Sequence, residues 1–388
     1  MMARLGDICE VLNGYAFKSE KYTSSGVRII RIANVQKGYI EDTAPAFYPI
    51  DTTDIEKYTL YEDDLLISLT GNVGRVALLK KEFLPAALNQ RVACLRLKDS
   101  AQYDKSFLYC FLNSDYFENK CIQSAKGVAQ KNMSIEWLKE YQIPNLSLVE
   151  QKEIAAVLNK ISELISARTM QLSKMDMFVK SRFIELFGMP GTDAFGWGLV
   201  PLGSTCNINP KKSLDSRLVS GAVVSFVPMP AVTEHGEIDA TAIKEYDEVK
   251  TGFTYFAEND VLFAKITPCM ENGKGAVAKG LHNGIGFGST EFHVLRPISG
   301  KTDPYWIYTL TAFSQFRMNA ASNMTGSAGQ RRVPASFLEN YRVSLPPIAL
   351  QEQFAAFVEQ TDKSKLAIQQ SLEKLETLKK ALMQQYFG

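Results

Sequence analysis

The feature that most constrains this chain is a repeat with a period of about 200 residues. Matching segments lie 200 positions apart at Gln130-Lys131 and Gln330-Arg331, Trp137-Leu138 and Phe337-Leu338, and Tyr141 and Tyr341. Each half opens on Leu-Gly and closes on Phe-Gly, at Leu5-Gly6, Leu202-Gly203, Phe187-Gly188 and Phe387-Gly388. Ile143-Pro144 and Leu345-Pro346 each lead within seven residues to a Glu-Gln pair, Glu150-Gln151 and Glu352-Gln353. A period this long indicates a duplicated domain and not a solenoid.

The first part of each copy is predicted to be a mixed, mostly β domain. Residues 3–148 and 196–347 contain short apolar runs separated by Gly, Asn and Asp, as expected for strands joined by turns. The clearest predicted strands are Val27–Ile32, Leu65–Leu69, Val92–Leu97 and Val223–Val227. Two segments rich in aromatic residues, Tyr103–Lys120 and Pro304–Arg317, are predicted to be helices packed on these strands.

The second part of each copy, residues 149–187 and 348–387, is predicted to be one long helix, since neither contains proline or glycine before the closing Phe-Gly. Apolar residues recur at alternating steps of four and three, which is the heptad pattern of a coiled coil. The predicted pairing residues are Ile154, Leu158, Ile161, Ile165, Leu172 and Met175 in the first helix, and Val358, Ile368, Leu372, Leu375 and Leu382 in the second. Because both helices keep one heptad phase, we expect them to pair with each other.

The predicted length of these helices suits a spacing function. A helix of roughly 38 residues is on the order of 57 Å long. One turn of B-DNA measures about 34 Å. The pair is therefore long enough to hold two domains over separate stretches of one duplex. The alternative is that both helices only dimerise the protein.

Composition bounds the class of protein. Hydrophobic residues make up 46% of the chain, which is enough for packed cores. No stretch approaches the roughly 20 apolar residues of a membrane span, and charged residues interrupt any N-terminal signal core. The six cysteines form no paired framework, which is typical of reduced residues in a cytoplasmic protein. The net charge of +1 means that any contact with nucleic acid depends on local basic patches.

A set of short motifs follows in order along the chain. In the first half they are Gly74-Arg75-Val76, Leu88-Asn89-Gln90-Arg91-Val92, and Gln130-Lys131-Asn132 followed by Ile143-Pro144, Glu150-Gln151 and a long helix. In the second half, the run from Gly288 to Pro297 is a motif of the same kind. Together these motifs resemble those of the specificity subunits of type I restriction-modification systems, and the resemblance covers essentially the whole chain, including the repeat.

This resemblance implies an α+β fold with a pseudo-twofold internal repeat, in which two target-recognition domains alternate with two long helices that pair as an antiparallel coiled coil. The expected boundaries are 1–148 and 189–347 for the recognition domains, and 149–188 and 348–388 for the helices. Each domain would read one half of a split, asymmetric target on double-stranded DNA, and the helices would set the unread spacer.

The resemblance also implies partners. The helices would dock two copies of a modification subunit, which methylates adenine with S-adenosylmethionine. A restriction subunit would add translocation and cleavage that depend on ATP and Mg. This chain would itself be no enzyme and would hold no catalytic site, cofactor or metal.

Candidate DNA contacts follow from the chemistry of base edges, since Arg and Lys suit guanine and Asn and Gln suit adenine. The two halves hardly align over Asn13–Gly38 and Asn207–Glu237, so we expect them to read different sequences. The candidates in the first domain are Lys18, Arg28, Arg31, Asn34, Asn72, Arg75, Asn89, Gln90 and Arg91. Those in the second are Lys211, Lys212, Arg217, Lys265, Lys274 and His282. For each, a solvated surface side chain is the alternative.

Two loops, 124–132 and 322–332, are stronger candidates. Each combines small residues and a glycine with a Gln that basic side chains follow. Flexible backbone beside cations suits close approach to a phosphate or a groove. The predicted contacts are Lys126, Gln130 and Lys131 in the first loop and Gln330, Arg331 and Arg332 in the second. The alternative is a glycine-containing turn with incidental charge.

Signatures of catalysis are missing from the sequence. The adenine-methylase run Asn-Pro-Pro-Tyr and the P-loop lysine motif are both absent. A loose nuclease-like spacing places Asp239 before Glu248-Val249-Lys250. The remaining alternatives to a specificity subunit are a stand-alone, two-headed DNA-binding regulator and a metal-dependent nuclease.

Overall fold

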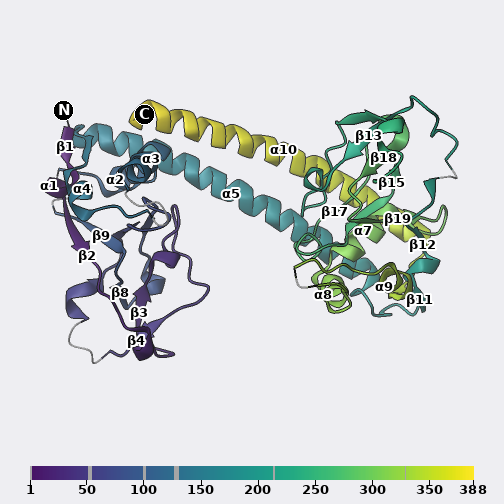
Figure 1. The fold of residues 1–388 in the computed structure, drawn as a ribbon, viewed down its shortest axis with the longest axis horizontal. Helices are drawn as coiled ribbons and strands as arrows, with labels where there is room; N and C mark the ends of the chain where they lie inside the picture. The colour runs from purple at the N-terminus through teal and green to yellow at the C-terminus, as the bar shows by residue number, and fades with distance from the viewer. Residues whose placement is uncertain (1, 51–54, 99–101, 126–130, 213–214, 328) are drawn as a thin grey trace. The chain divides into compact units, whose positions relative to one another are not determined.

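A computed structural model describes residues 2–50, 55–98, 102–125, 131–212, 215–327 and 329–388, which form two compact units. The first unit comprises residues 1–168 and 371–388, and the second comprises residues 169–370 (Figure 1). Each unit therefore contains one β domain, the beginning of one long helix and the end of the other. None of the helices in the described part of the chain is long and apolar enough to cross a membrane.

The described residues of the first β domain form two four-stranded sheets and a two-stranded ribbon. One sheet, of order β2-β9-β6-β7, is antiparallel throughout, and the other, β4-β3-β8-β5, has the parallel pair β3 and β8 at its centre. The ribbon pairs β1 with β10 and so ties the entry of the domain to its exit. The strands are β1 (Met2–Arg4), β2 (Cys9–Asn13), β3 (Val27–Ile30), β4 (Phe47–Tyr48), β5 (Thr59–Leu60), β6 (Leu65–Ser68), β7 (Val76–Leu78), β8 (Ala86–Leu88), β9 (Val92–Leu97) and β10 (Gln142–Pro144).

The second β domain repeats this topology strand for strand. Its sheets have the orders β12-β19-β16-β17 and β14-β13-β18-β15, its ribbon pairs β11 with β20, and β13 and β18 form the parallel pair. The strands are β11 (Leu199–Pro201), β12 (Cys206–Ile208), β13 (Val223–Val227), β14 (Ile243–Glu245), β15 (Thr254–Ala257), β16 (Val261–Ala264), β17 (Gly275–Val277), β18 (Ile285–Gly288), β19 (Phe292–Pro297) and β20 (Arg342–Ser344). The predicted duplication of a mixed, mostly β domain is confirmed.

Each aromatic segment that was predicted as one helix consists of two. The pairs are α2 (Lys105–Leu112) with α3 (Asp115–Ser124), and α7 (Pro304–Ala312) with α8 (Ser314–Ser322). In the first domain Ser114 makes the break, because its hydroxyl donates to the Phe111 carbonyl at 2.6 Å and accepts from the Phe117 N–H at 3.1 Å. One side chain thus closes α2 and caps α3. The single-helix prediction was wrong because it followed apolar content and overlooked this cap.

The predicted strand Val27–Ile32 is also too long. β3 stops at Ile30, because the Arg31 N–H donates to the Asn34 side chain at 2.9 Å and starts a 3-10 turn over residues 32–34. Short helices complete each domain: α1 (Leu5–Ile8) and α4 (Ile135–Glu140) in the first, and α6 (Tyr246–Val249) and α9 (Ala335–Asn340) in the second.

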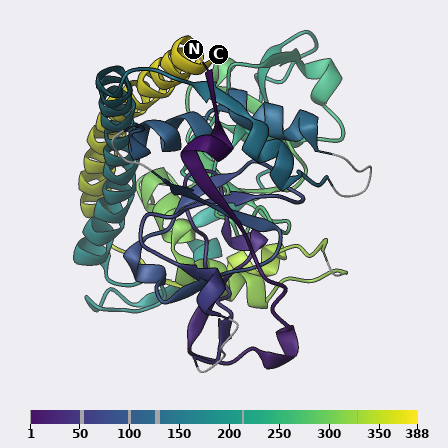
Figure 2. The same cartoon turned by 90° about the vertical axis from the view of Figure 1, so that its left-hand side faces the viewer.

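The long helices are α5 (Leu148–Phe187) and α10 (Ile348–Phe387), of 40 residues each. In the first unit the beginning of α5 lies beside the end of α10, and in the second the end of α5 lies beside the beginning of α10 (Figures 1 and 2). The two helices therefore pack antiparallel. The heptad residues are buried or half-buried: Ile154, Leu158, Ile161, Ile165, Leu172 and Met175 in α5, and Val358, Ile368, Leu372, Leu375 and Leu382 in α10. Lys365 takes a seam position and pairs with Asp176 of α5 at 2.6 Å.

Each long helix ends inside the core of a β domain. In the first unit, Phe387 of α10 packs on Phe107 and Phe111, with ring centroids 5.7 and 5.3 Å away. In the second unit, Phe187 of α5 packs on Phe354 of α10 at 5.4 Å, and Phe183 of α5 packs on Phe313 of the β domain at 5.2 Å, all within one core cluster. The closing Phe-Gly of each half is thus an aromatic anchor followed by a helix end.

A fully buried glutamine pins the start of each long helix to its own β domain. Oε1 of Gln151 accepts from the Asp104 N–H at 2.9 Å, while Nε2 donates to the carbonyls of Gln102 and Leu146. Gln351 repeats this pattern with the Asp303 N–H at 3.0 Å and the carbonyls of Lys301 and Pro346 at 3.1 and 2.8 Å. Both donors and the acceptor of each amide are therefore satisfied without water.

These contacts correct the register of the repeat. The sequence match paired Gln151 with Gln353, but the structure pairs it with Gln351, and Gln353 is exposed. In the ribbons, Ile143 faces Ala3 and Val343 faces Val200, so Ile143-Pro144 corresponds to Val343-Ser344. The offset of 200 residues continues into the helices unbroken. The pairing of Gln151 with Gln353 was wrong because it aligned identical residues and did not consider which glutamine is buried.

Replacing the buried amide should therefore be costly. In Gln351→Leu, the Asp303 N–H and two carbonyls lose their hydrogen-bond partners. Each buried polar group left without a hydrogen bond lowers the free energy of unfolding by about 1–3 kcal/mol. We expect the free energy of unfolding to fall by about 2 kcal/mol or more, measured by urea denaturation. Gln353→Leu, two residues further along the same helix and exposed, is the matched control. Equal midpoints for the two variants would show that the amide contacts contribute nothing.

Candidate nucleic-acid interface

Three backbone segments meet at one place in the first β domain. They are the connection from β6 to β7, the turn from β8 to β9, and the segment before α4; we call residues 69–75, 89–91 and 131–133 the first junction. The Leu69 N–H donates to the Arg91 carbonyl at 2.8 Å, and the Met133 N–H donates to the Leu69 carbonyl at 2.8 Å. The Gly71 N–H donates to the Lys131 carbonyl at 2.9 Å. Candidates far apart in the sequence are thereby brought together.

The second β domain has the same junction, formed by residues 265–274, 289–291 and 330–333. Here the Lys265 N–H donates to the Glu291 carbonyl at 2.9 Å, and the Val333 N–H donates to the Lys265 carbonyl at 2.9 Å. The Thr267 N–H donates to the Arg331 carbonyl at 3.0 Å. Because the hydrogen bonds correspond one to one, positions can be equated as Arg91 with Glu291, Lys131 with Arg331, and Asn132 with Arg332.

Basic side chains line the first junction. Gln90, Arg91 and Lys131 are exposed, and Arg91 has a φ of 71°, a conformation that residues with side chains rarely adopt and that clusters at functional sites. Arg75 donates to Gln36, and the Asn72 amide oxygen, when oriented toward Arg75, lies 3.2 and 3.3 Å from its two terminal nitrogens. Asn89 is buried, so its side chain is less accessible than those of its neighbours.

Ion pairs occupy the second junction. Arg332 donates to Glu291 through Nε at 2.9 Å and through a terminal nitrogen at 2.8 Å, and this contact holds the pKa of the Glu291 carboxyl below its usual range. Arg331 lies 3.9 Å from a carboxylate oxygen of Glu271. Gln330 is exposed, Lys265 is half-buried, and Lys274 reaches the Met229 carbonyl at 3.5 Å. The predicted basic loop is therefore largely neutralised by acids from other segments.

A buried histidine forms hydrogen bonds with residues of the second junction and with β12's neighbour Asn209. Nε2 of His293 lies 2.8 Å from the Val333 carbonyl oxygen, and Nδ1 lies 3.0 Å from the side-chain nitrogen of Asn209. Since a carbonyl oxygen only accepts, Nε2 carries the proton and Nδ1 is free to accept from Asn209. Burial lowers the pKa of His293, so the neutral ring is favoured.

Several candidates of the first domain have internal partners. Arg28 pairs with Asp42 and lies over the Phe47 ring at 4.9 Å, while Arg31 donates to the Ala44 carbonyl at 2.5 Å. Asn34 is buried and donates to the Glu41 carbonyl at 2.7 Å. These three side chains hold residues 41–44 against residues 28–34. Lys18 is exposed at the start of a 3-10 turn, and Lys126 and Gln130 lie outside the described residues.

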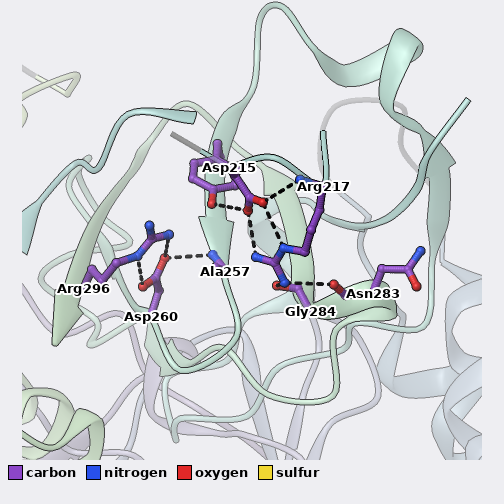
Figure 3. A network of polar contacts seen from close by, with 8 residues as sticks. Asp215, Arg217, Ala257, Asp260, Asn283, Gly284 and Arg296 are labelled. Atoms are coloured by element: carbon purple, nitrogen blue, oxygen red, sulfur yellow. Dashed lines mark hydrogen bonds and ion pairs between the residues drawn. The ribbon is translucent and has the colours of Figure 1, made fainter. Parts of the chain in front are cut away.

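Arg217 of the second domain belongs to a polar network (Figure 3). It donates to Asp215 through Nε at 2.9 Å and a terminal nitrogen at 2.7 Å, which lowers the pKa of that carboxyl, and to the Asn283 carbonyl at 3.1 Å. The network ties residues 215–217 to the turn at 282–284. His282 is exposed on this turn, Lys211 is exposed as well, and Lys212 donates to the Lys250 carbonyl.

The sequence interpretation missed a pair of framework arginines. Arg296 donates to Asp260 at 2.8 and 2.7 Å, and Asp260 also accepts from the Ala257 N–H at 2.8 Å (Figure 3). Arg96 and Asp64 repeat the arrangement at 2.9 and 2.7 Å in the first domain. The signal was present, because the arginines lie 200 residues apart and each aspartate immediately precedes a buried strand.

The nuclease-like residues have other partners. Asp239 accepts from the Thr241 hydroxyl at 2.6 Å, and Glu248 accepts from the Glu245 N–H at 3.4 Å. Within the described ranges, no three His, Cys, Asp or Glu side chains gather as metal ligands. Nothing in these contacts supports the nuclease alternative.

Two β domains of one topology, with differently charged junctions and two long antiparallel helices, define a duplicated binding protein with a helical linker. The family model described as type I restriction modification DNA specificity domain matches residues 1–174 and 196–379, and the chain belongs to this family.

Among curated relatives, the chain is 43% identical over 153 residues to the EcoEI specificity subunit of Escherichia coli and 41% identical over 159 residues to the EcoAI specificity subunit of the same organism. These matches cover 39% and 41% of this chain but 25% and 26% of the relatives, so the chain spans about a quarter of their length.

Solved structures share the fold. The type I restriction-modification S subunit from M. genitalium matches with a TM-score of 0.58 at 16% identity, over 100% of this chain and 96% of the other. A chain from a study of complex assembly and conformational transition of the type I R-M system gives 0.53 at 16% identity, over 100% and 97%. At this identity the likeness extends to the fold alone.

The buried histidine predicts a pH dependence of stability. Because the pKa of His293 is lowered in the folded state from its ordinary value of 6.5, the unfolded chain binds a proton that the folded chain does not. Stability should therefore fall as the pH drops below about 6.5, by about 1.4 kcal/mol for each unit between the two pKa values. Urea denaturation between pH 7.5 and 5.5 measures this slope. His293→Gln should flatten it and His282→Asn should not; an unchanged slope in His293→Gln would contradict the assignment.

Proposed function

We propose that this chain is the DNA-recognition subunit of a type I restriction-modification assembly, and that it carries no catalytic site or cofactor of its own. The observation that carries this proposal is a duplicated β domain whose strand topology is constant and whose junction side chains differ, as at Arg91 and Glu291. Two readers with one shape but different chemistry suit a two-part, asymmetric target on double-stranded DNA.

The proposed division of labour follows the elements. Residues 1–148 and 189–347 read the two half-sites, and residues 149–188 and 348–388 set the unread spacer. The helices have 40 residues each, or about 60 Å at the usual rise per residue. Their heptad contacts and buried glutamines support a fixed attachment of each β domain to its helix.

The proposed partners are two copies of a modification subunit that uses S-adenosylmethionine, and a restriction subunit that uses ATP and Mg. An apolar stripe on α5 supports a helical docking surface: Met170, Met177 and Ile184 recur every seven residues and are 55, 56 and 38% exposed. Near the start of α5, Val157 and Leu164 show the same spacing and are also exposed. We place the assembly in the cytoplasm, in keeping with the six free cysteines.

Domain exchange tests this function. Residues 3–148 would be replaced by the corresponding domain of another family member, and adenine methylation in the host genome would be mapped by single-molecule sequencing. One half of the methylated sequence should change and the other should persist, because each domain reads its half-site alone. Methylation that is unaltered by the exchange, or by deletion of the gene, would favour the stand-alone regulator.

Helix length should set the spacer. One heptad inserted after Leu172, with a second after Ile368 to keep the helices paired, lengthens the pair by about 10 Å, or about three base pairs. We expect the methylated target to gain a longer spacer with unchanged half-sites. Substituting exposed polar residues of α5 outside the stripe of Met170, Met177 and Ile184, without insertion, is the control. A target with its original spacer would contradict a measuring role for the helices.

A further inference from the structure

The two junctions share main-chain hydrogen bonds but differ in how their basic side chains are paired. In the first, Arg91 and Lys131 are exposed, and neither forms an ion pair with any residue that the structure describes. In the second, the position of Arg91 is held by Glu291, and Arg332 replaces Asn132. Arg332 and Glu291 are joined through two short hydrogen bonds, and Glu271 stands beside Arg331. Among the described residues, Arg91 and Lys131 of the first junction therefore lack an acidic partner, whereas Arg331 and Arg332 of the second each have one.

The main-chain hydrogen bonds that close the two turns correspond. Arg91 sits in a tight turn closed by the Val92 N–H to the Asn89 carbonyl at 3.3 Å, and its own carbonyl is held by Leu69. The second turn is closed in the same way, by the Phe292 N–H to the Ser289 carbonyl at 3.2 Å. These hydrogen bonds place Arg91 and Glu291 at equivalent positions in the two turns, and of the two residues only Arg91 has a positive φ.

The pairing of these basic side chains determines how each junction can contact DNA. A cation that neutralises a phosphate releases a condensed counterion, and each such contact adds about 0.9 to the salt dependence of binding. Arg91 and Lys131 are available for such contacts. Arg332 would first have to leave Glu291, whose carboxylate would then face the phosphates.

We propose that the first domain clamps the DNA backbone through Arg91 and Lys131, while Arg331 and Arg332 at the junction of the second domain stay paired with Glu271 and Glu291. The half-site of the first domain then carries the larger share of the salt-dependent affinity. This inference rests on the proposed function, and it assigns to the two domains unequal electrostatic roles within one target.

A reciprocal exchange of the two equivalent residues tests the proposal. Arg91→Glu and Glu291→Arg would be made in the full chain, assembled with its modification subunits. Binding to a duplex carrying the mapped target would be measured from 50 to 300 mM KCl. Arg91→Glu should reduce the slope of log K against log salt by about 1–2, and Glu291→Arg, which frees Arg332 and adds a cation, should increase it by about 1–2.

Matched controls carry the same charge changes away from the junctions: Lys81→Glu in the first domain and Glu352→Arg at the start of α10, both exposed positions. Their slopes should stay near that of the wild type, and circular dichroism melting checks that each variant is folded. If Arg91→Glu behaves like Lys81→Glu while the wild type still binds its mapped target, the proposal is overturned and the proposed function stands. If the wild-type assembly shows no preference for that target, the proposed function itself fails.

Discussion

Aromatic side chains at the ends of the two long helices are buried in the cores of the β domains, and the rest of the architecture depends on this burial. Phe187 and Phe387 are almost fully buried, and burial of a phenylalanine side chain contributes roughly 2–3 kcal/mol. Each core is completed by a helix that begins in the other copy, since α10 closes the first core and α5 the second. The duplicated halves are consequently interlocked, and each unit contains parts of both.

The framework and the variable surface of each domain follow different rules. The framework uses main-chain hydrogen bonds and repeated buried pairs, such as Arg96 with Asp64 and Arg296 with Asp260, which recur in both copies. The junctions keep the main-chain contacts and change the side chains, so that Arg91 in one copy becomes Glu291 in the other. A constant scaffold with interchangeable side chains is what the proposed recognition of two different half-sites requires.

Periodicity in the sequence was enough to predict the duplication, the long helices and the residues between them. Buried apolar residues recur at a regular spacing along a helix, and this spacing can be recognised without knowing which residues they contact. Features that depend on one side chain were not predicted. The cap at Ser114 split a predicted helix, and the buried Gln351 shifted the expected register by two residues.

The candidate interface was predicted only in part, for a related reason. A basic residue looks the same in sequence whether it faces solvent or a carboxylate, and the partner of Arg332 lies 41 positions away in the chain. Arg28, Arg31 and Arg217 were likewise found to have internal partners, and topology was needed to bring Arg91 and Lys131 together.

The glutamine pins have an evolutionary consequence. Each amide bonds to main-chain atoms alone: an N–H and two carbonyl oxygens. Such atoms are present whatever side chains the neighbouring positions carry. A β domain can therefore drift in sequence, or be replaced by recombination with another of the same topology, without loss of its attachment to the helix. The attachment therefore does not depend on the side chains that, under the proposed function, would have to change for a new DNA target to be read.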